Sequence, residues 1–224
     1  MAGSSPAAAL RVIAHGRRIA STGPPCRRLP PCPPVPSYPP LDLVLPRPAA
    51  DECAPYYQGY LAAVDSDRIG AQLIAQADAV SRLLGPLDEA TARHRYAPGK
   101  WSVKEVCGHL TDTERVFAYR LLRIARGDAT PLPGFDEDTF VAHGGFDARP
   151  IAALADEFRT TRAATIALVR GLDADAWTRR GTASGQPVSA TALAWLLVGH
   201  VAHHVRLLHE RYGIAPPVMV DARD

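Results

Sequence analysis

The chain has 224 residues, with 25 Lys and Arg against 23 Asp and Glu, and a net charge of +2 at pH 7. This near-neutral balance excludes a protein that binds nucleic acid through a strong positive field. No apolar run reaches the roughly 18 residues expected of a membrane-spanning helix. The four cysteines are scattered and do not resemble a disulfide framework, so we expect a cytoplasmic protein.

Residues 1–50 differ in composition from the rest of the chain. They hold 12 of the 21 prolines, six arginines, no lysine and a single acidic residue, Asp42. Proline at this density interrupts helices and strands alike, so we predict a disordered segment over residues 1–53. An early start codon, a linker or ligand for a proline-binding module, and an organellar transit peptide would each explain it. A folded domain is expected over 54–215, with a flexible tail at 216–224.

The first two predicted helices are marked by apolar residues at helical spacing and by clear ends. Residues 66–84 form the first, which stops at a Gly-Pro pair. The second begins at Ser102, which is spaced to form a capping box with Glu105, and continues to about Arg126. A long loop is expected to follow, over residues 130–149.

Two further helices complete the prediction. The third covers residues 151–171, and the fourth runs from Thr191 to Gly213 with Ser189 as its N-cap. Residues 172–189 connect them, and no alternating pattern of useful length predicts a strand. Four helices that each carry one apolar face predict an all-α four-helix bundle.

The fourth helix carries four of the eight histidines. At about 100° per residue, one stripe along this helix contains both apolar and imidazole side chains. Its members are Leu193, Leu197, His200, His204, Leu207 and Arg211. His200 and His204 therefore point the same way, whereas His203 and His209 point elsewhere. Such an i, i+4 pair is a usual way for a helix to hold a metal, although chance and hydrogen-bonded core histidines also produce it.

His109 lies on the inner face of the second helix and offers a third ligand. Three neutral imidazoles suit a divalent transition metal and leave coordination positions open, as in catalytic sites. Arg120 lies on the same face, where it is either a contact for a substrate carboxylate or a solvated side chain at the rim of the bundle. Three nearby acids are either partners of the imidazoles or part of the solvated face: Glu105, Asp112 and Glu114.

Three stretches of the chain resemble the DinB-like (DinB/YfiT) superfamily of metal-dependent four-helix-bundle proteins. They are YAPGKWSVKEVCGHLTDTERVFAYRLLRIARGD, PLPGFDEDTF and GTASGQPVSATALAWLLVGHVAHHVRLLHERYG. The resemblance covers about residues 56–213. It implies an up-down-down-up bundle, often dimeric, that binds nickel or zinc, with iron, manganese or copper as alternatives. The family's three histidine ligands correspond to His109, His200 and His204.

The resemblance also implies a class of chemistry. Some relatives are thiol S-transferases, so we expect an enzyme that activates a small thiol or water, of the thiol S-transferase or hydrolase type. Its substrate would be a small molecule such as a low-molecular-weight thiol, without nucleic acid or membrane as partner. The alternative is a non-catalytic binding or stress-response module that the metal only stabilises. Tyr119 and Leu122 lie outside the core stripe and would suit a helix-mediated homodimer.

Overall fold

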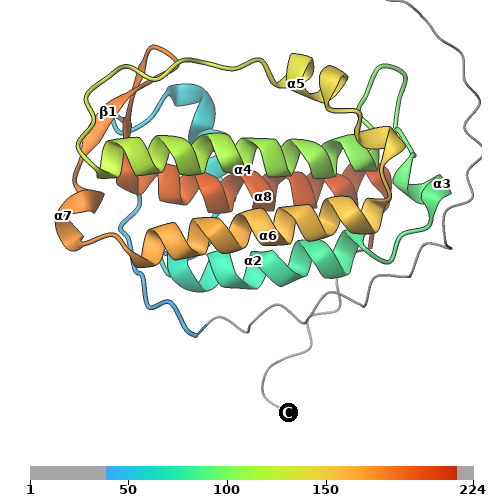
Figure 1. Cartoon of the computed structure of the whole chain (residues 1–224), viewed down its shortest axis with the longest axis horizontal. Coiled ribbons are helices and arrows are strands. Elements are labelled where there is room, and N and C mark those ends of the chain that lie inside the picture. Colours follow the sequence, from blue (N-terminus) through green and yellow to red (C-terminus); the bar gives the residue numbers. More distant parts are fainter. Residues whose placement is uncertain (1–38, 216–224) are drawn as a thin grey trace, which may run out of the picture. The chain divides into compact units, whose positions relative to one another are not determined.

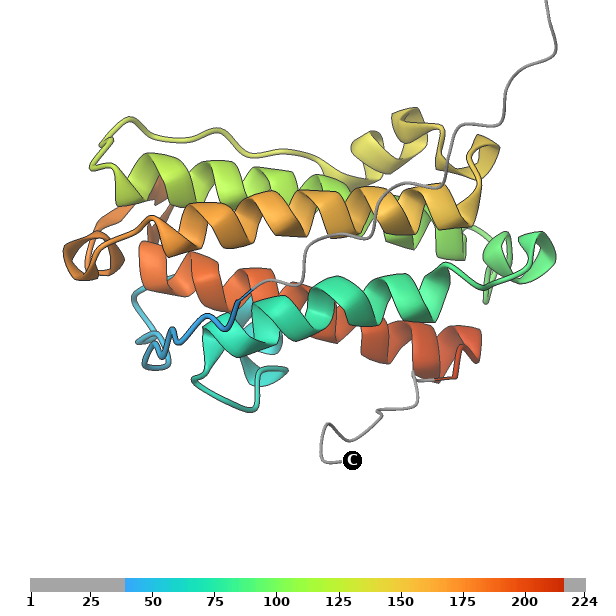
Figure 2. The same cartoon turned by 60° about the horizontal axis from the view of Figure 1, so that its bottom comes forward.

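The computed structural model describes residues 39–215, which are mostly helical (Figures 1 and 2). Four long helices form a bundle, as predicted: α2 (Ile69–Leu84), α4 (Val103–Ala125), α6 (Ile151–Arg170) and α8 (Ala190–Tyr212). Their ends lie within a few residues of the predicted ones. The predicted disorder of residues 1–38 and the predicted flexible tail at 216–224 lie outside the described residues.

The order of the helices is up-down-down-up, as the resemblance implied. α2 and α8 run in one direction along the bundle, and α4 and α6 run in the other (Figure 1). α4 and α6 are parallel because the chain between them returns along the whole bundle, past α5, before α6 begins (Figure 1). Two long helices that follow each other can be parallel only with such a long connection.

Local signals in the sequence explain why the ends of α4 and α8 were predicted well. Ser102 Oγ accepts a hydrogen bond from the Glu105 amide at 3.0 Å, and the Glu105 carboxylate accepts one from the Ser102 amide at 2.8 Å. Ser189 Oγ caps α8 by accepting from the Ala192 amide at 2.9 Å. Gly213 ends α8 with a φ of 68°, in the left-handed region that glycine adopts without strain.

The two long connections contain more structure than predicted. The first holds α5 (Glu137–Gly144) and the 3-10 helix η2 (Phe146–Ala148). The second holds α7 (Ala174–Trp177) and an antiparallel hairpin of β1 (Arg180–Ala183) and β2 (Gln186–Ser189). The sequence showed no alternating pattern of useful length, so it did not predict this hairpin. Strands of four residues are too short for an alternating pattern, and a Ser-Gly turn with φ values of 53° and 73° joins them.

The predicted start of order near Ala54 was wrong for residues 39–53. Leu45 is only 5% exposed, and its carbonyl accepts a hydrogen bond from Trp195 Nε1 on α8 at 3.2 Å. The backbone amides of Leu45 and Gly70 also form hydrogen bonds between this segment and residues 67–70. Proline prevents regular structure here, but it does not prevent an extended segment from packing against helices.

A short unpredicted segment, η1 (Pro55–Tyr57) and α1 (Gln58–Ala62), packs across the middle of α8. The close approach depends on Gly199, because a Cβ at that position would lie 2.2 Å from the Tyr60 carbonyl oxygen. A glycine on α8 thus brings Tyr60 against the neighbouring residue, His200. None of the helices that the structure describes, including α3 (Glu89–Ala92), is long and apolar enough to cross a bilayer.

The apolar core is divided into two clusters, one toward each end of the bundle. One contains Phe117 and Leu197, and the other contains Leu110 and Val201. Between them lie buried polar side chains from the long helices, together with the half-buried Gln76, which we call the polar layer. Its members are Gln76, Thr113, Glu114, Arg162, Thr165 and His200. His109 and His204 lie at one edge of this layer, beside the second apolar cluster.

Candidate metal centre

The three predicted histidines meet inside the bundle. His109 comes from α4, and His200 and His204 come from α8, with 3%, 3% and 8% of their surfaces exposed. One ring nitrogen of each lies within 4.8 Å of the other two. Nε2 of His109 and Nε2 of His200 are 2.9 Å apart. Sequence spacing had placed the two histidines of α8 together, and the bundle adds the third from a segment about ninety residues away.

The donor set fits a divalent transition metal. Ligand atoms about 2.0–2.1 Å from a tetrahedral ion are about 3.4 Å apart. This distance is longer than the 2.9 Å between the nitrogens of His109 and His200, and shorter than the 4.8 Å within which all three ring nitrogens lie. Nδ1 of His204 is buried and has no hydrogen-bond partner among the described residues. Buried imidazoles normally satisfy both ring nitrogens, so this cluster is incomplete as a purely structural core.

Burial keeps the three imidazoles neutral. It lowers the pKa of His109 from 6.5 to about 4, and a repulsive effect of His203 adds to the shift. Burial also lowers the pKa of His200 and of His204 well below the usual value, and repulsion from the other imidazoles of the cluster contributes in both cases. Neutral imidazole is the form that offers a lone pair to a metal.

Aromatic rings surround the cluster and limit its contact with water. Trp101 lies against His109, with ring centroids 4.7 Å apart. Tyr60 and Phe117 meet His200 edge to face, at centroid distances of 5.3 and 5.9 Å. The hydroxyl of Thr113 approaches Nδ1 of His109 at 3.5 Å, a distance too long for more than a weak hydrogen bond.

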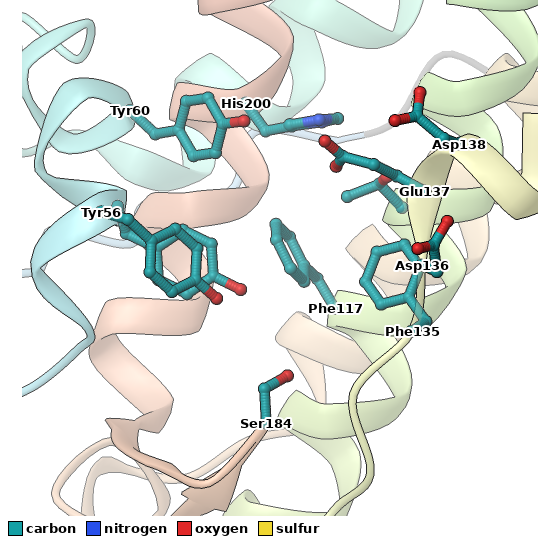
Figure 3. A pocket seen from close by; sticks show the side chains of 11 residues that line it. Tyr56, Tyr60, Phe117, Phe135, Asp136, Glu137, Asp138, Ser184 and His200 are labelled. Atoms are coloured by element: carbon teal, nitrogen blue, oxygen red, sulfur yellow. The ribbon is translucent and has the colours of Figure 1, made fainter.

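Two cavities reach the histidines from different sides. The first, of about 390 Å³, is lined by His200 and Thr113 together with aromatic and acidic residues (Figure 3). The second, of about 310 Å³, is lined by His204 and Trp101. Asp138 of α5 lines both. A metal held by the histidines would therefore be accessible to small molecules, which distinguishes this cluster from a closed structural site.

The other predicted site residues have different roles. Arg120 is only 3% exposed, and its guanidinium donates to the Pro133 carbonyl and to Ser184 Oγ, each at 2.9 Å. It does not line the cavity beside His200, whereas Ser184 does. These bonds support the hairpin turn, and direct substrate contact by Arg120 stays a prediction. Of the three nearby acids, Glu105 pairs with Arg95, Asp112 with Arg115, and Glu114 with Arg162.

Several residues around the site could not be identified from the sequence. Tyr60, Glu137 and Asp138 reach the cavities from α1 and α5, two short helices that periodicity did not predict. The local signals were the stretch PLPGFDEDTF, which contains Glu137 and Asp138, and the tyrosines at 56, 57 and 60. Trp101 also forms a cavity wall, just ahead of α4.

Two proteins are among those whose solved structures resemble this fold. One is YfiT from Bacillus subtilis, described as a probable metal-dependent hydrolase with an unusual four-helix bundle topology. The match has 15% identity and a TM-score of 0.57, and it covers 68% of this chain and 91% of that one. The other is a mycothiol-dependent maleylpyruvate isomerase, with 20% identity and a TM-score of 0.51, covering 60% of this chain and 56% of that one.

At these identities the two structures establish the similarity of fold only. No curated protein matches the chain in sequence. The family model of the DinB superfamily matches residues 72–208, which include all three histidines, all of α4 and α6, and most of α2 and α8. With more than half of the sequence matched, the chain belongs to the DinB superfamily.

Proposed function

We propose that this protein is a metal-dependent enzyme that activates a small thiol or a water molecule, of the thiol S-transferase or hydrolase type. The observation that carries the proposal is the convergence of His109, His200 and His204, buried and neutral, at a point that two cavities reach. The fold relatives support it, since one is described as a probable metal-dependent hydrolase and the other as mycothiol-dependent.

The three imidazoles would hold the ion, and the bound ion would supply Lewis acidity that lowers the pKa of a coordinated thiol or water. Edge-to-face contacts with Tyr60 and Phe117 hold the His200 ring in its orientation. Trp101 does the same for His109. These rings also exclude water from one side of the centre, which strengthens electrostatic interactions within it. The cavity beside His200 would orient the reacting molecule.

Elemental analysis of the purified, untagged protein is the direct test of the proposal. We expect about one divalent ion per chain, and close to none in His204→Ala, because two imidazoles bind a metal far more weakly than three. His209→Ala is the matched control, since His209 lies outside the cluster and is exposed. An undiminished metal content in His204→Ala would remove the site. Turnover of a thiol and an electrophile, compared with and without chelator, then tests the reaction class.

Three finer features belong to the same proposal. Zinc or nickel is favoured by the nitrogen donor set, with iron, manganese or copper as alternatives. Tyr119 and Leu122 are 49% and 39% exposed on α4, and they support a homodimer formed through this helix. A cytoplasmic location stays a prediction, supported by the free thiols of Cys53 and Cys107.

A further inference from the structure

The cavity beside His200 is walled by aromatic rings from separate parts of the chain. They come from η1 and α1, from α4 and from the segment before α5, and they face the space from opposite sides (Figure 3). The rings belong to Tyr56, Tyr57, Tyr60, Phe117 and Phe135. Tyr57 meets Phe117 edge to face at 6.0 Å, so rings from the two sides are in contact at the inner end.

The charged groups of this cavity are all acidic. Asp136, Glu137 and Asp138 line it, whereas no Lys or Arg is among the lining residues that the structure describes. Figure 3 shows the Glu137 side chain directed toward His200 and Tyr60. Partial burial and the two flanking aspartates raise the pKa of Glu137, and no cation is among the causes of the shift.

Arg120 is a cation behind this wall, where hydrogen bonds to neutral groups hold it in place. Its guanidinium carbon lies 5.6 Å from the centre of the Phe135 ring, and its Nη2 donates to Pro133 and Ser184. It supports the far side of Phe135 without lining the cavity. The cavity therefore combines aromatic walls with carboxylates and has no Lys or Arg among its described lining residues, which is the combination that recognises organic cations.

We propose that this cavity selects a ligand with an ammonium group, and in the first instance a small aminothiol whose sulfur reaches the histidine centre. The ammonium would lie among the ring faces and beside Glu137, and a carboxylate in the same position would be repelled. The identification of the ligand as a thiol rests on the proposed function, whereas the preference for a positive charge rests on the cavity alone.

A series of three thiols of similar size tests the preference in the metal-loaded protein. Cysteamine carries an ammonium, 2-mercaptoethanol is neutral and 3-mercaptopropionate carries a carboxylate. By calorimetric titration we expect cysteamine to bind about 10-fold more tightly than 3-mercaptopropionate, with 2-mercaptoethanol between them. Equal affinities, or tighter binding of the carboxylate, would overturn the proposal.

Variants distinguish a preference that comes from the cavity from one that comes from chelation of the metal ion by the aminothiol. Glu137→Gln combined with Asp138→Asn should reduce the preference for cysteamine to about 3-fold or less, because two of the three carboxylates are lost. Glu210→Gln removes an acid that does not line the cavity, so it should leave the preference unchanged. If the preference for cysteamine survives in the double variant, it comes from the metal ion, and the proposal is overturned. Loss of metal from Glu137→Gln would also overturn it.

The metal-free protein distinguishes failure of this inference from failure of the proposed function. Propylammonium and propionate, which contain no sulfur, are titrated into protein stripped by chelator. We expect only propylammonium to bind, and to bind more tightly than in the metal-loaded protein, because the positive ion no longer opposes it. This result would support the inference even if no thiol were turned over. Metal and thiol binding without any preference for propylammonium would leave the proposed function standing and reject the inference.

Discussion

Two groups of buried polar side chains lie side by side in this bundle, and they are satisfied in opposite ways. Arg162 is fully buried, with its Nε 2.8 Å from Glu114 Oε1 as an ion pair. Its Nη2 donates to Glu114 Oε2 and to the Leu197 carbonyl at 2.9 Å, and its Nη1 donates to Gln76 Oε1 at 3.0 Å. Gln76 in turn donates to the Val198 carbonyl at 3.0 Å. This Arg162 network joins all four long helices and balances its own charge.

The histidine cluster joins only α4 and α8, and its neutral imidazoles are not all hydrogen-bonded. Its members face one another, only one short contact joins their ring nitrogens, and Nδ1 of His204 has no partner among the described residues. Both groups are costly to bury, since polar atoms lose their hydration. Arg162 Nε and Glu114 Oε1 have no hydrogen-bond partner among the described residues, but they face each other as an ion pair, so this network balances its charges within the protein. The histidine cluster instead leaves a buried ring nitrogen without any partner of opposite charge, and a bound cation would complete it. This contrast identifies the Arg162 network as structural and the histidine cluster as a candidate functional site, independently of the family.

The largest expected effect comes from breaking the Arg162 network. Arg162→Met leaves Glu114 buried without its cation, so we expect the free energy of unfolding to fall by about 3–5 kcal/mol. Urea denaturation measures the change. The double variant Arg162→Met, Glu114→Leu should recover most of the loss because no unpaired charge remains. A single variant within about 1 kcal/mol of the parent would show that the network is not the structural element we describe.

Removal of metal should have the next largest effect, and it should act on the histidine cluster alone. An ion present at a thousand times its dissociation constant adds about 4 kcal/mol to the stability of the folded state. Chelator should therefore lower the melting temperature of the parent protein and leave that of His204→Ala unchanged. A calorimetric scan of both proteins, with and without chelator, measures this. Equal responses would mean that the ion binds elsewhere.

Acid should destabilise the metal-free protein through the same cluster. The pKa of His109 is about 4 in the folded chain and near 6.5 when unfolded, so only the unfolded chain takes up a proton between these values. The contribution of His109 is complete above pH 6.5 and is lost as the pH falls toward 4. From pH 7 to pH 5 we expect a loss of about 2 kcal/mol from His109 alone. Urea titrations at both pH values measure it, and His109→Asn should show a smaller loss.

Gly199→Ala should have a moderate effect that reaches the cluster indirectly. The added Cβ would lie 2.2 Å from the Tyr60 carbonyl oxygen, so α1 must move away from α8. We expect a loss of about 1–3 kcal/mol, as for other overpacked sites. The metal content should be retained, while tyrosine fluorescence should report greater exposure of the rings. Unchanged fluorescence and stability would indicate that α1 does not depend on Gly199.

The smallest effect is expected for His203→Ala. His203 is half-buried on α8 and lies beside His204 and Tyr60, with ring centroids 5.1 Å away in each case, but it is outside the converging set. We expect a full complement of metal and a change in stability of at most about 0.5 kcal/mol, as for a surface substitution. Elemental analysis is the measurement, and loss of metal would place His203 among the ligands.

The sequence by itself determined the parts of the protein that depend on local chemistry. Helical periodicity and caps such as Ser102 and Ser189 identified the four long helices, because these signals act within a few residues. The same periodicity separated His200 and His204 from His203 and His209, since neighbours on one helix face are four residues apart. The bundle and its histidine set were therefore predictable.

Tertiary structure decided what surrounds those histidines. The cavity walls come from α1 and α5, which are too short to show a period and are held in place by packing against α8 and α4. The approach of Tyr60 depends on the absence of a side chain at Gly199, and the burial of Arg120 depends on a hairpin of four-residue strands. Such contacts join residues far apart in the chain, so no local pattern encodes them. The metal ligands could be read from single helices, but the shape and charge of the space beside them could not.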